Sequence, residues 1–317
     1  MNRLKVFVAG HKGMVGSAIV KLLKKKKSIH LITRNKKDLD LTNQSDVKYF
    51  FKQEKIDQVY LAAAKVGGIY ANNTYPAEFI YENIMIQTNI IHAAFISGVK
   101  KLLFLGSSCV YPKNTSTPIK ENQLLTGPLE PTNEPYAIAK ISGIKMCDSY
   151  NRQYKNIDFR CVMPTNLYGP GDKYHSENSH VIPALIQKFH QAKIRKDQKV
   201  IVWGSGLAKR EFLYIDDFAR ACLQIMKLNK NIYIKKLKGK THINVGSGIN
   251  YTIRFLSKTI KKIVGYNGKI EFTSGYLEGV KKKNLNNRLI NSIGWKKKVS
   301  LKEGIIKAYK DFKKNKC

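Results

Sequence analysis

Three residues have the types and spacing needed to reduce a carbonyl group. Tyr136 and Lys140 lie four residues apart in a segment with helical spacing, so both side chains are expected on one face of a helix. Tyrosine has a pKa of about 10 in water, and a neighbouring ammonium is expected to lower that pKa by stabilising the phenolate. Ser107 follows an apolar segment, and its hydroxyl could bind the same carbonyl oxygen. Although a Tyr and a Lys at this spacing are common on helix surfaces, the three residues together predict a site for hydride transfer between a carbonyl and an alcohol.

A glycine-rich turn predicts where the hydride donor binds. The turn lies between an apolar segment typical of a strand, residues 4–9, and a segment of helical spacing, residues 14–26. Glycines allow a tight turn and a close approach of the backbone to a pyrophosphate, while the helix N-terminus favours negative charge. We therefore expect a dinucleotide to bind this turn, which consists of Gly10, His11, Lys12, Gly13, Met14, Val15 and Gly16.

The end of the second predicted strand favours NADP(H) over NAD(H). A site for NAD usually has an acidic residue there, which binds the ribose 2′-hydroxyl. This chain has Arg34 and Lys36 instead, and Lys12 lies in the glycine-rich turn. In so lysine-rich a chain, any single lysine is as much expected to face solvent as to bind a cofactor. The preference for NADP(H) therefore depends mainly on Arg34 and on the missing acidic residue. Cations at these positions suit a 2′-phosphate.

The order of the segments predicts an α/β fold. Strand-like and helix-like segments alternate through residue 166, which is typical of a doubly wound (Rossmann) parallel sheet. We expect a cofactor domain over residues 1–166, with a return of the chain around 211–248, and a smaller mixed α/β substrate domain over 167–317. The expected strands are 4–9, 30–33, 58–64, 101–107, 158–163, 199–203 and 211–215, and the expected helices are 14–26, 46–53, 82–97, 135–154, 183–192 and one through 226.

Composition excludes several classes of protein. The 317 residues include 43% hydrophobic residues, as in globular proteins, and no apolar run approaches the roughly 18 residues of a membrane span. No signal-peptide pattern precedes the first strand. The five cysteines are scattered without a CxxC pair, so neither disulfides nor a metal site is expected. We therefore expect a protein of the reducing cytoplasm, with no membrane partner.

A net charge of +35 raises the question of nucleic-acid binding. Only nine of the 57 basic residues are arginine, and the lysines form scattered runs that are typical of a compositional bias at exposed positions. We therefore expect no specific nucleic-acid partner, although a Rossmann-fold protein that binds nucleic acid stays a possible alternative. The same field would attract an anionic small molecule such as a nucleotide.

Long segments of the chain resemble the extended short-chain dehydrogenase/reductases. Within that family they are similar to the NADP-dependent enzymes that epimerise and reduce GDP-4-keto-6-deoxy-D-mannose, a GDP-sugar, to GDP-L-fucose. Another nucleotide-sugar 4-epimerase or reductase of the family is the alternative. The resemblance covers nearly the whole chain, and it is carried by residues 8–19, 62–76 (AAAKVGGIYANNTYP), 105–109, 130–140 (EPTNEPYAIAK), 163–169, 179–184, 203–206 and 210–212.

The resemblance implies a role for each matching residue. Tyr136 would be the general acid at the C4 oxygen, supported by Lys140 and Ser107, while Cys109 would be the base of the epimerisation and His180 its acid. It also implies a homodimer formed by the two long helices, 82–97 and 135–154. Further cofactor contacts would come from Leu105, Gly106, Ser107, Ser108, Lys140, Pro164, Thr165, Asn166, Leu167 and His180, and the substrate contacts from Lys188, Trp203, Arg210 and Glu278.

The resemblance is weakest over residues 273–289. Related chains usually have Pro-Arg-Lys and a later Asp there, whereas this chain has Lys281, Lys282 and Lys283 followed by Asn286. Lysine lacks the two-pronged geometry of arginine, and asparagine lacks the charge of aspartate. These differences affect the substrate contacts that the resemblance implies for this segment, including that of Glu278, and leave the residues of the predicted chemistry unchanged.

Overall fold

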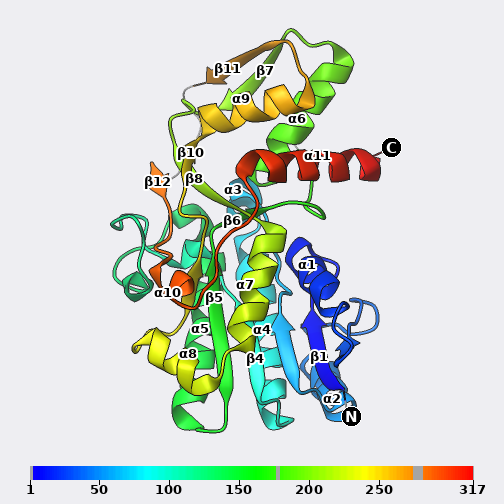
Figure 1. Ribbon diagram of the computed structural model, residues 1–317, viewed down its shortest axis with the longest axis vertical. Helices are drawn as coiled ribbons and strands as arrows, with labels where there is room; N and C mark the ends of the chain where they lie inside the picture. The colour runs from blue at the N-terminus through cyan, green and yellow to red at the C-terminus, as the bar shows by residue number, and fades with distance from the viewer. Residues whose placement is uncertain (1–2, 176–178, 274–280, 317) are drawn as a thin grey trace.

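The computed structural model describes residues 3–175, 179–273 and 281–316, which form two lobes (Figure 1). The larger lobe is built on a six-stranded sheet of order β2-β1-β3-β4-β5-β9, and every neighbouring pair of strands is parallel. This arrangement confirms the predicted doubly wound α/β fold. The strands are β1 (Leu4–Ala9), β2 (Ile29–Ile32), β3 (Gln58–Leu61), β4 (Lys101–Leu105), β5 (Asp158–Pro164) and β9 (Ile243–Val245).

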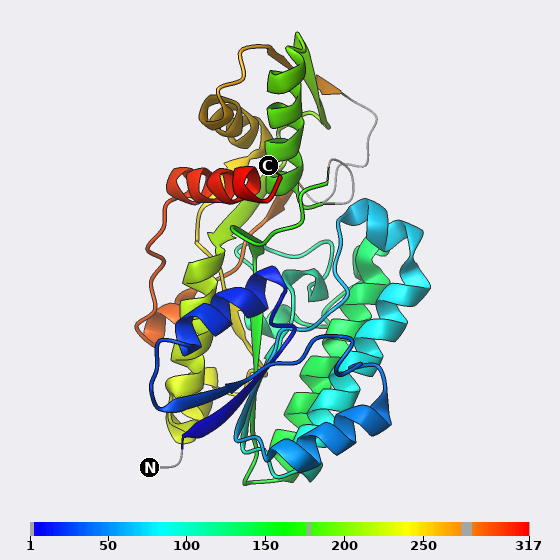
Figure 2. The same ribbon diagram turned by 90° about the vertical axis from the view of Figure 1, so that its right-hand side faces the viewer.

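Helices cover both faces of the sheet (Figure 2). Alternate residues of β1 show why, because Val6 and Val8 belong to one buried cluster while Phe7 and Ala9 belong to the other. Side chains of successive strand residues point to opposite faces, so a strand that is apolar throughout needs cover on both. The cover on one face comes from α2 (Gln44–Glu54), α4 (Pro76–Ile96) and α5 (Glu134–Gln153), and on the other from α1 (Met14–Leu23) and α7 (Ile215–Lys227), which is followed by α8 (Lys230–Leu237).

Several elements differ in length from the prediction. Helix α4 begins at Pro76 rather than at residue 82, because Pro76 occupies the first turn, where its missing N–H costs nothing. Strand β4 ends at Leu105 rather than at residue 107, and a short 3₁₀ turn, η1 (Ser108–Val110), follows. Gly106 still donates a backbone hydrogen bond of 2.9 Å to Val162 of β5, and Ser107 then lies at the carboxyl edge of the sheet.

The smaller lobe is organised around β8 (Lys209–Tyr214). Strands β6 (Asn166–Tyr168) and β12 (Lys282–Lys283) pair with β8 in parallel, and β10 (Asn250–Thr252) pairs with it antiparallel. A separate parallel pair joins β7 (Lys199–Trp203) to β11 (Lys269–Thr273). The other elements outside the large sheet are α3 (Ile69–Thr74), η2 (Glu121–Gln123), η3 (Pro131–Asn133), α6 (Val181–Arg195), α9 (Ile253–Val264), α10 (Arg288–Ser292) and α11 (Leu301–Lys316).

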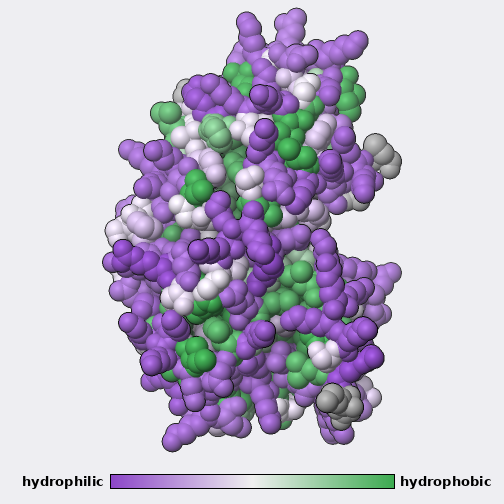
Figure 3. Space-filling view, in the orientation of Figure 1, coloured by the Kyte–Doolittle hydropathy of each residue, from purple (hydrophilic) through white to green (hydrophobic). Residues whose placement is uncertain are grey.

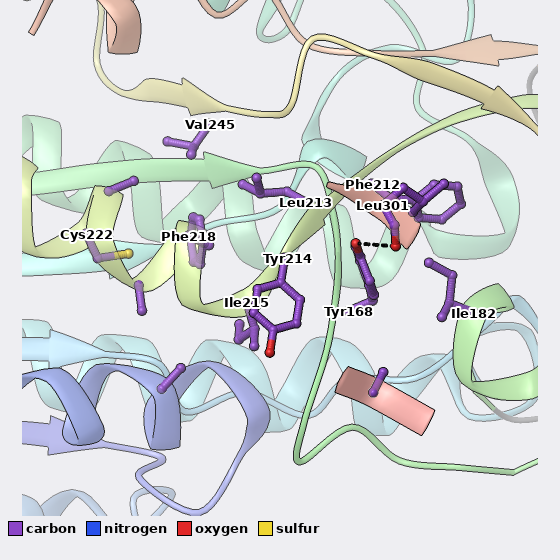
Figure 4. Close-up of a cluster of buried hydrophobic side chains, with 14 of the residues drawn as sticks. Tyr168, Ile182, Phe212, Leu213, Tyr214, Ile215, Phe218, Cys222, Val245 and Leu301 are labelled. Carbon is purple, nitrogen blue, oxygen red and sulfur yellow. Dashed lines mark hydrogen bonds between the residues drawn. The ribbon is translucent and has the colours of Figure 1, made fainter. Parts of the chain in front are cut away.

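One hydrophobic core continues from the sheet into the smaller lobe (Figure 4). Leu213, Ile215 and Phe218 run from β8 into α7 and are almost completely buried. Beside them, the hydroxyl of Tyr168 donates a hydrogen bond of 3.3 Å to the carbonyl oxygen of Leu301, at the start of α11. Because a continuous packed core resists relative movement, it holds the lobes in one arrangement around the space between them.

Hydrophilic side chains cover most of the surface face in Figure 3, as the composition predicts. Across the three described ranges, no helix is long and apolar enough to cross a membrane.

Candidate active site

A pocket of ≈ 210 Å³ lies at the carboxyl edge of the sheet, where the two lobes meet. In a doubly wound sheet this edge is where ligands bind. The pocket walls come from the β4–η1 connection, α5, the start of α6, β6, β8 and β12. The predicted residues that line it are Ser107, Ser108, Cys109, Tyr136, Asn166, His180 and Arg210.

Lys140 lies behind the pocket wall and is buried. Its Nζ donates a hydrogen bond of 2.9 Å to the carbonyl oxygen of Leu105, and it lies 5.7 Å from the centre of the Tyr136 ring. Burial lowers the pKa of Lys140 to about 8, because the low-dielectric surroundings disfavour the charged amine. Lys140 therefore still carries its charge at neutral pH, beside the tyrosine with which it was paired in the sequence.

The pKa of Tyr136 differs in direction from the prediction. Burial raises the pKa of its hydroxyl above the ordinary value, and the neighbouring Cys109 acts in the same direction. We expected Lys140 to lower this pKa, but burial is the largest influence on it and raises it, because low-dielectric surroundings disfavour the charged phenolate. The phenol is thus protonated at neutral pH, which suits a group that gives a proton to an alkoxide and not one that removes a proton first.

Cys109 and Ser107 lie together at the end of β4. Ser107 Oγ accepts a hydrogen bond of 3.4 Å from the backbone N–H of Cys109, which caps the short turn η1. Burial raises the pKa of the Cys109 thiol, while Lys283, a hydrogen bond with Ser107 and Lys140 oppose that shift. Cations near a thiol increase the share of the reactive thiolate.

Sequence reasoning missed Lys283 as part of this site. Lys283 lies on β12, lines the same pocket and is the first of the groups that favour the Cys109 thiolate. It was noted only as one of three lysines in the segment least similar to related chains. Its pairing with Arg210 across β12 and β8 is a contact between residues 73 positions apart, which no local pattern shows.

His180 is the residue that precedes α6, and its side chain does not cap that helix. The residue is exposed overall, but it faces the pocket among packed side chains, and desolvation lowers the pKa of its imidazole. Its neutral form therefore predominates near neutral pH, so it can act as an acid only after it has taken up a proton.

The glycine-rich turn fits a dinucleotide. A side chain at Gly16 would place its Cβ 2.1 Å from the carbonyl oxygen of Gly10, and a Cβ at Gly10 would lie 2.7 Å from the backbone of Ala63. Only glycine fits at either position. Helix α1 begins directly after Gly13, with no side-chain cap and no acidic residue in its first turn. Its first N–H groups and its positive end are therefore available to a pyrophosphate.

Arg34 already contacts other residues of the larger lobe. Its guanidinium pairs with Glu54, donates to the Thr33 carbonyl at 2.9 Å and lies 5.2 Å from the centre of the Phe50 ring. Arg34 would therefore have to leave these contacts to bind a 2′-phosphate. Lys12 and Lys36 are exposed.

The predicted substrate residues divide into three groups. Arg210 lines the pocket, whereas Lys188 and Trp203 lie outside its lining and contact each other, with Nζ 4.3 Å from the ring centre. Such a cation and indole could bind a nucleotide base or diphosphate. Glu278 lies outside the described residues. Among the residues predicted on β5 and β6, Asn166 lines the pocket and its amide also donates to the carbonyl oxygen of Glu211 at 2.9 Å.

Known proteins resemble the chain over nearly its whole length. Residues 6–246 match the family described as NAD dependent epimerase/dehydratase. A relative from Escherichia coli strain K12, named GDP-L-fucose synthase, is 52% identical over 316 residues, which are 99% of this chain and 98% of the relative.

Two solved structures agree with the fold, and one of them contains NADP. A GDP-6-OMe-4-keto-L-xylo-heptose reductase from C. jejuni is 37% identical, with a TM-score of 0.93 and 99% of each chain covered. A GDP-L-fucose synthetase from Naegleria fowleri bound to NADP is 26% identical, with a TM-score of 0.88, covering 99% of this chain and 95% of that one. Together with the glycine-rich turn and the Tyr–Lys pair, these matches identify an NADP(H)-dependent oxidoreductase that belongs to the NAD-dependent epimerase/dehydratase family of extended short-chain dehydrogenases/reductases.

Proposed function

We propose that the protein converts GDP-4-keto-6-deoxy-D-mannose to GDP-L-fucose by epimerisation at C3 and C5 and NADPH-dependent reduction at C4. The observation that carries the proposal is the presence of a thiol and an imidazole, Cys109 and His180, in the same pocket as Tyr136. Reduction of a ketone needs only the tyrosine and its lysine. A base and a second acid beside them supply what epimerisation requires, and the relative named GDP-L-fucose synthase supports the choice of substrate.

In the epimerisation, the Cys109 thiolate removes the proton from a carbon next to the C4 ketone, and the electron pair moves onto the C4 oxygen. Ser107 and Tyr136 can donate hydrogen bonds to that oxygen as its charge develops. The imidazolium of His180 then gives a proton to the carbon on the opposite face. Exchange with solvent returns the thiol and the imidazole to their starting forms, so deuterium from heavy water should enter the sugar at C3 and C5.

In the reduction, NADPH would supply a hydride for C4 when it is bound. Tyr136 gives its phenolic proton to the C4 oxygen, and the Lys140 ammonium stabilises the phenolate that is left. The cofactor would be held by the turn from Gly10 to Gly16. Because epimerisation and reduction both place negative charge on the C4 oxygen, one set of donors can serve every step.

The test is the oxidation of NADPH by the purified protein, followed by absorbance with GDP-4-keto-6-deoxy-D-mannose present. We expect turnover, with GDP-L-fucose as the product. A second candidate is the reduction of another GDP-linked keto sugar, which the similar C. jejuni heptose reductase favours. A protein that reduces a GDP-linked keto-heptose but not the hexose would replace the first proposal with the second.

We further propose that the protein acts in the cytoplasm as a homodimer. Helices α4 and α5 carry exposed apolar side chains, including Tyr81, Ile96 and Ile138, which a second copy could cover. Light scattering after gel filtration should give twice the monomer mass.

We also propose that residues 1–166, with 211–248, bind the cofactor and that the rest of 167–317 binds the GDP-sugar. Helix α7 and strand β9 support the return of the chain, since both contribute to the core of the larger lobe.

A further inference from the structure

Two asparagines that line the pocket each have a carboxamide oxygen without a hydrogen-bond partner among the described residues. Asn72 on α3 and Asn133 at the end of η3 both line the pocket, and the Oδ1 atom of each is buried and unpaired among the described residues. Asn72 as a whole is only 6% exposed. A buried acceptor without a donor is unusual, because its lost contact with water is not replaced.

The contacts of Asn72 fix which atom is free. Its Nδ2 donates to the carbonyl oxygens of Gly67, at 3.0 Å, and Gly68, at 2.9 Å. Turning the amide over would place its oxygen against two other acceptors, so Oδ1 must be the atom without a partner. Gly67 and Gly68 line the pocket as well, so this amide is held at the pocket wall.

The Oδ1 atom of Asn133 lacks a hydrogen-bond partner for a different reason. It is the residue before the first turn of α5, where an asparagine commonly accepts hydrogen bonds from the helix N–H groups. Here its side chain makes no such bond, although the catalytic helix begins next to it. Elements α3 and η3 pack against each other, which brings the two asparagines into the same part of the pocket.

The chemistry of these oxygens restricts what they can bind. The C4 oxygen becomes negative during the reaction and needs donors, which Ser107, Tyr136 and nearby cations provide. A carboxamide oxygen is an acceptor and would repel that charge. It matches a donor on the ligand instead, and hydroxyl groups are the donors on a hexose ring.

We propose that Asn72 and Asn133 accept hydrogen bonds from ring hydroxyls of the sugar and thereby select substrates by their hydroxyl pattern. The inference rests on the proposed function, because it takes the ligand of this pocket to be a GDP-linked hexose. A substrate that lacks the matching hydroxyl would leave a buried oxygen unpaired, and such sites reject the deoxy analogue strongly.

The test compares GDP-4-keto-6-deoxy-D-mannose with its 2-deoxy and 3-deoxy analogues. The wild-type protein should prefer the full substrate over at least one analogue by about tenfold or more in kcat/KM, since one hydrogen bond of about 1.4 kcal/mol corresponds to that ratio. Asn133→Ala and Asn72→Ala should each lower kcat/KM for the full substrate and leave it unchanged for the analogue that lacks the hydroxyl bound by that asparagine, so this ratio falls toward one. Asn250→Ala is the matched control, because Asn250 also has an unpaired Oδ1 but lies outside the pocket.

A purely structural role predicts a different result. Asn72→Ala could disturb the Gly67–Gly68 turn, but a disturbed pocket would lower kcat/KM for all three substrates alike and keep the ratio. Asn133→Ala removes no hydrogen bond of Oδ1 within the described part of the chain and therefore tests the idea without that risk. A ratio that stays at the wild-type value in both variants would overturn the inference.

The dissociation constants of the full substrate and of the two deoxy analogues should also be measured, by titration calorimetry with NADP⁺ present, and their ratio compared between the wild type and the variants. This separates the two proposals. If the wild type binds the hexose but does not reduce it, the proposed function fails, while the change in the binding ratio still decides the role of the asparagines. Equal binding of the full and deoxy sugars by the wild type would also exclude that role.

Discussion

Lys140 on α5 donates a hydrogen bond of 2.9 Å from Nζ to the main-chain carbonyl oxygen of Leu105, the last residue of β4. The bond ties the helix that carries Tyr136 to the strand whose end carries Ser107. Both partners are buried, so the carbonyl has no water to replace the lysine. Lys140 therefore positions two elements of the site and also supplies the positive charge beside the phenol.

Replacing Lys140 with methionine should reduce the rate of NADPH oxidation by roughly a hundredfold or more, since an acid–base pair contributes on that order. The loss should appear in kcat, because the charge acts on the transition state. Lys145→Met, an exposed change on the same helix, should leave the rate near the wild-type value.

In the wild type, reduction should also slow above about pH 8, where Lys140 loses its proton. A rate that stays constant to pH 10 would exclude a need for the ammonium.

Tyr136→Phe and Cys109→Ser should separate the two halves of the reaction. Without its phenol, the protein cannot protonate the C4 oxygen during reduction, so NADPH oxidation should disappear while deuterium exchange at C3 or C5 stays measurable. Cys109→Ser should suppress that exchange, because a serine hydroxyl is a far weaker acid than a thiol. Mass spectrometry of the sugar in heavy water measures exchange. Unchanged reduction in the first variant, or full exchange in the second, would remove the assigned role.

Lys283 should set the pH at which Cys109 works. Burial raises the pKa of the thiol and Lys283 opposes that rise, so Lys283→Met should leave the thiol protonated up to a higher pH. We expect the rate of deuterium exchange to rise with pH about one pH unit later than in the wild type. Lys283→Arg keeps the charge and should restore most of the profile. A lower rate with an unmoved profile in the methionine variant would indicate that Lys283 only binds substrate.

Local patterns predicted the parts of the site that depend on neighbours in sequence. The spacing of Tyr136 and Lys140 on one helix and the glycines of residues 10–16 are visible because helix geometry and turn chemistry act over a few positions. The family resemblance then supplied Cys109, His180 and Arg210, and the structure brings these three to the pocket that Tyr136 lines.

What the sequence could not reveal depends on the environment that the fold creates. Lys283 reaches the pocket through strand pairing with β8, and the unpaired oxygen of Asn72 is known only once its other contacts are known. The pKa of Tyr136 is raised rather than lowered because burial, which the helical pattern does not report, disfavours the charged phenolate. Arg34 is engaged by Glu54, a residue 20 positions away on α2.

Lys36 should contribute more to the choice of NADPH over NADH than Arg34 does. Lys36→Ala should weaken NADPH binding by about tenfold, because a charge-assisted hydrogen bond to phosphate is lost, and should not change NADH binding. Arg34→Ala removes the pair with Glu54 and the contact with Phe50, so we expect a lower melting temperature and a smaller effect on the ratio of the two affinities. Fluorescence titration gives both dissociation constants. A larger loss of preference in Arg34→Ala would show that the guanidinium leaves Glu54 for the cofactor.

Asp172 should make the protein less stable as the pH rises from about 4 to about 7. Burial raises the pKa of this carboxyl to about 7, and its Oδ2 atom has no partner within the described part of the chain. Between its ordinary pKa of about 4 and this raised value, the folded protein holds a proton that the unfolded chain has lost, so each increase in pH in this window favours unfolding. Asp172→Asn keeps the acceptor for the Lys173 N–H and removes the charge.

The Asp172→Asn variant should therefore gain up to about 4 kcal/mol of unfolding free energy at pH 8, and close to nothing at pH 4. Urea denaturation at the two pH values measures this difference. Asp197→Asn, a change at an exposed carboxylate, should show no comparable gain at pH 8. The turn that contains Asp172 also places Gly171 against Met14 and Ser17, at the start of the cofactor helix. An equal gain in unfolding free energy at both pH values would exclude titration of Asp172 as the cause. If the stabilised variant also binds NADPH more weakly, the charge at Asp172 serves the cofactor site and lowers the stability of the protein.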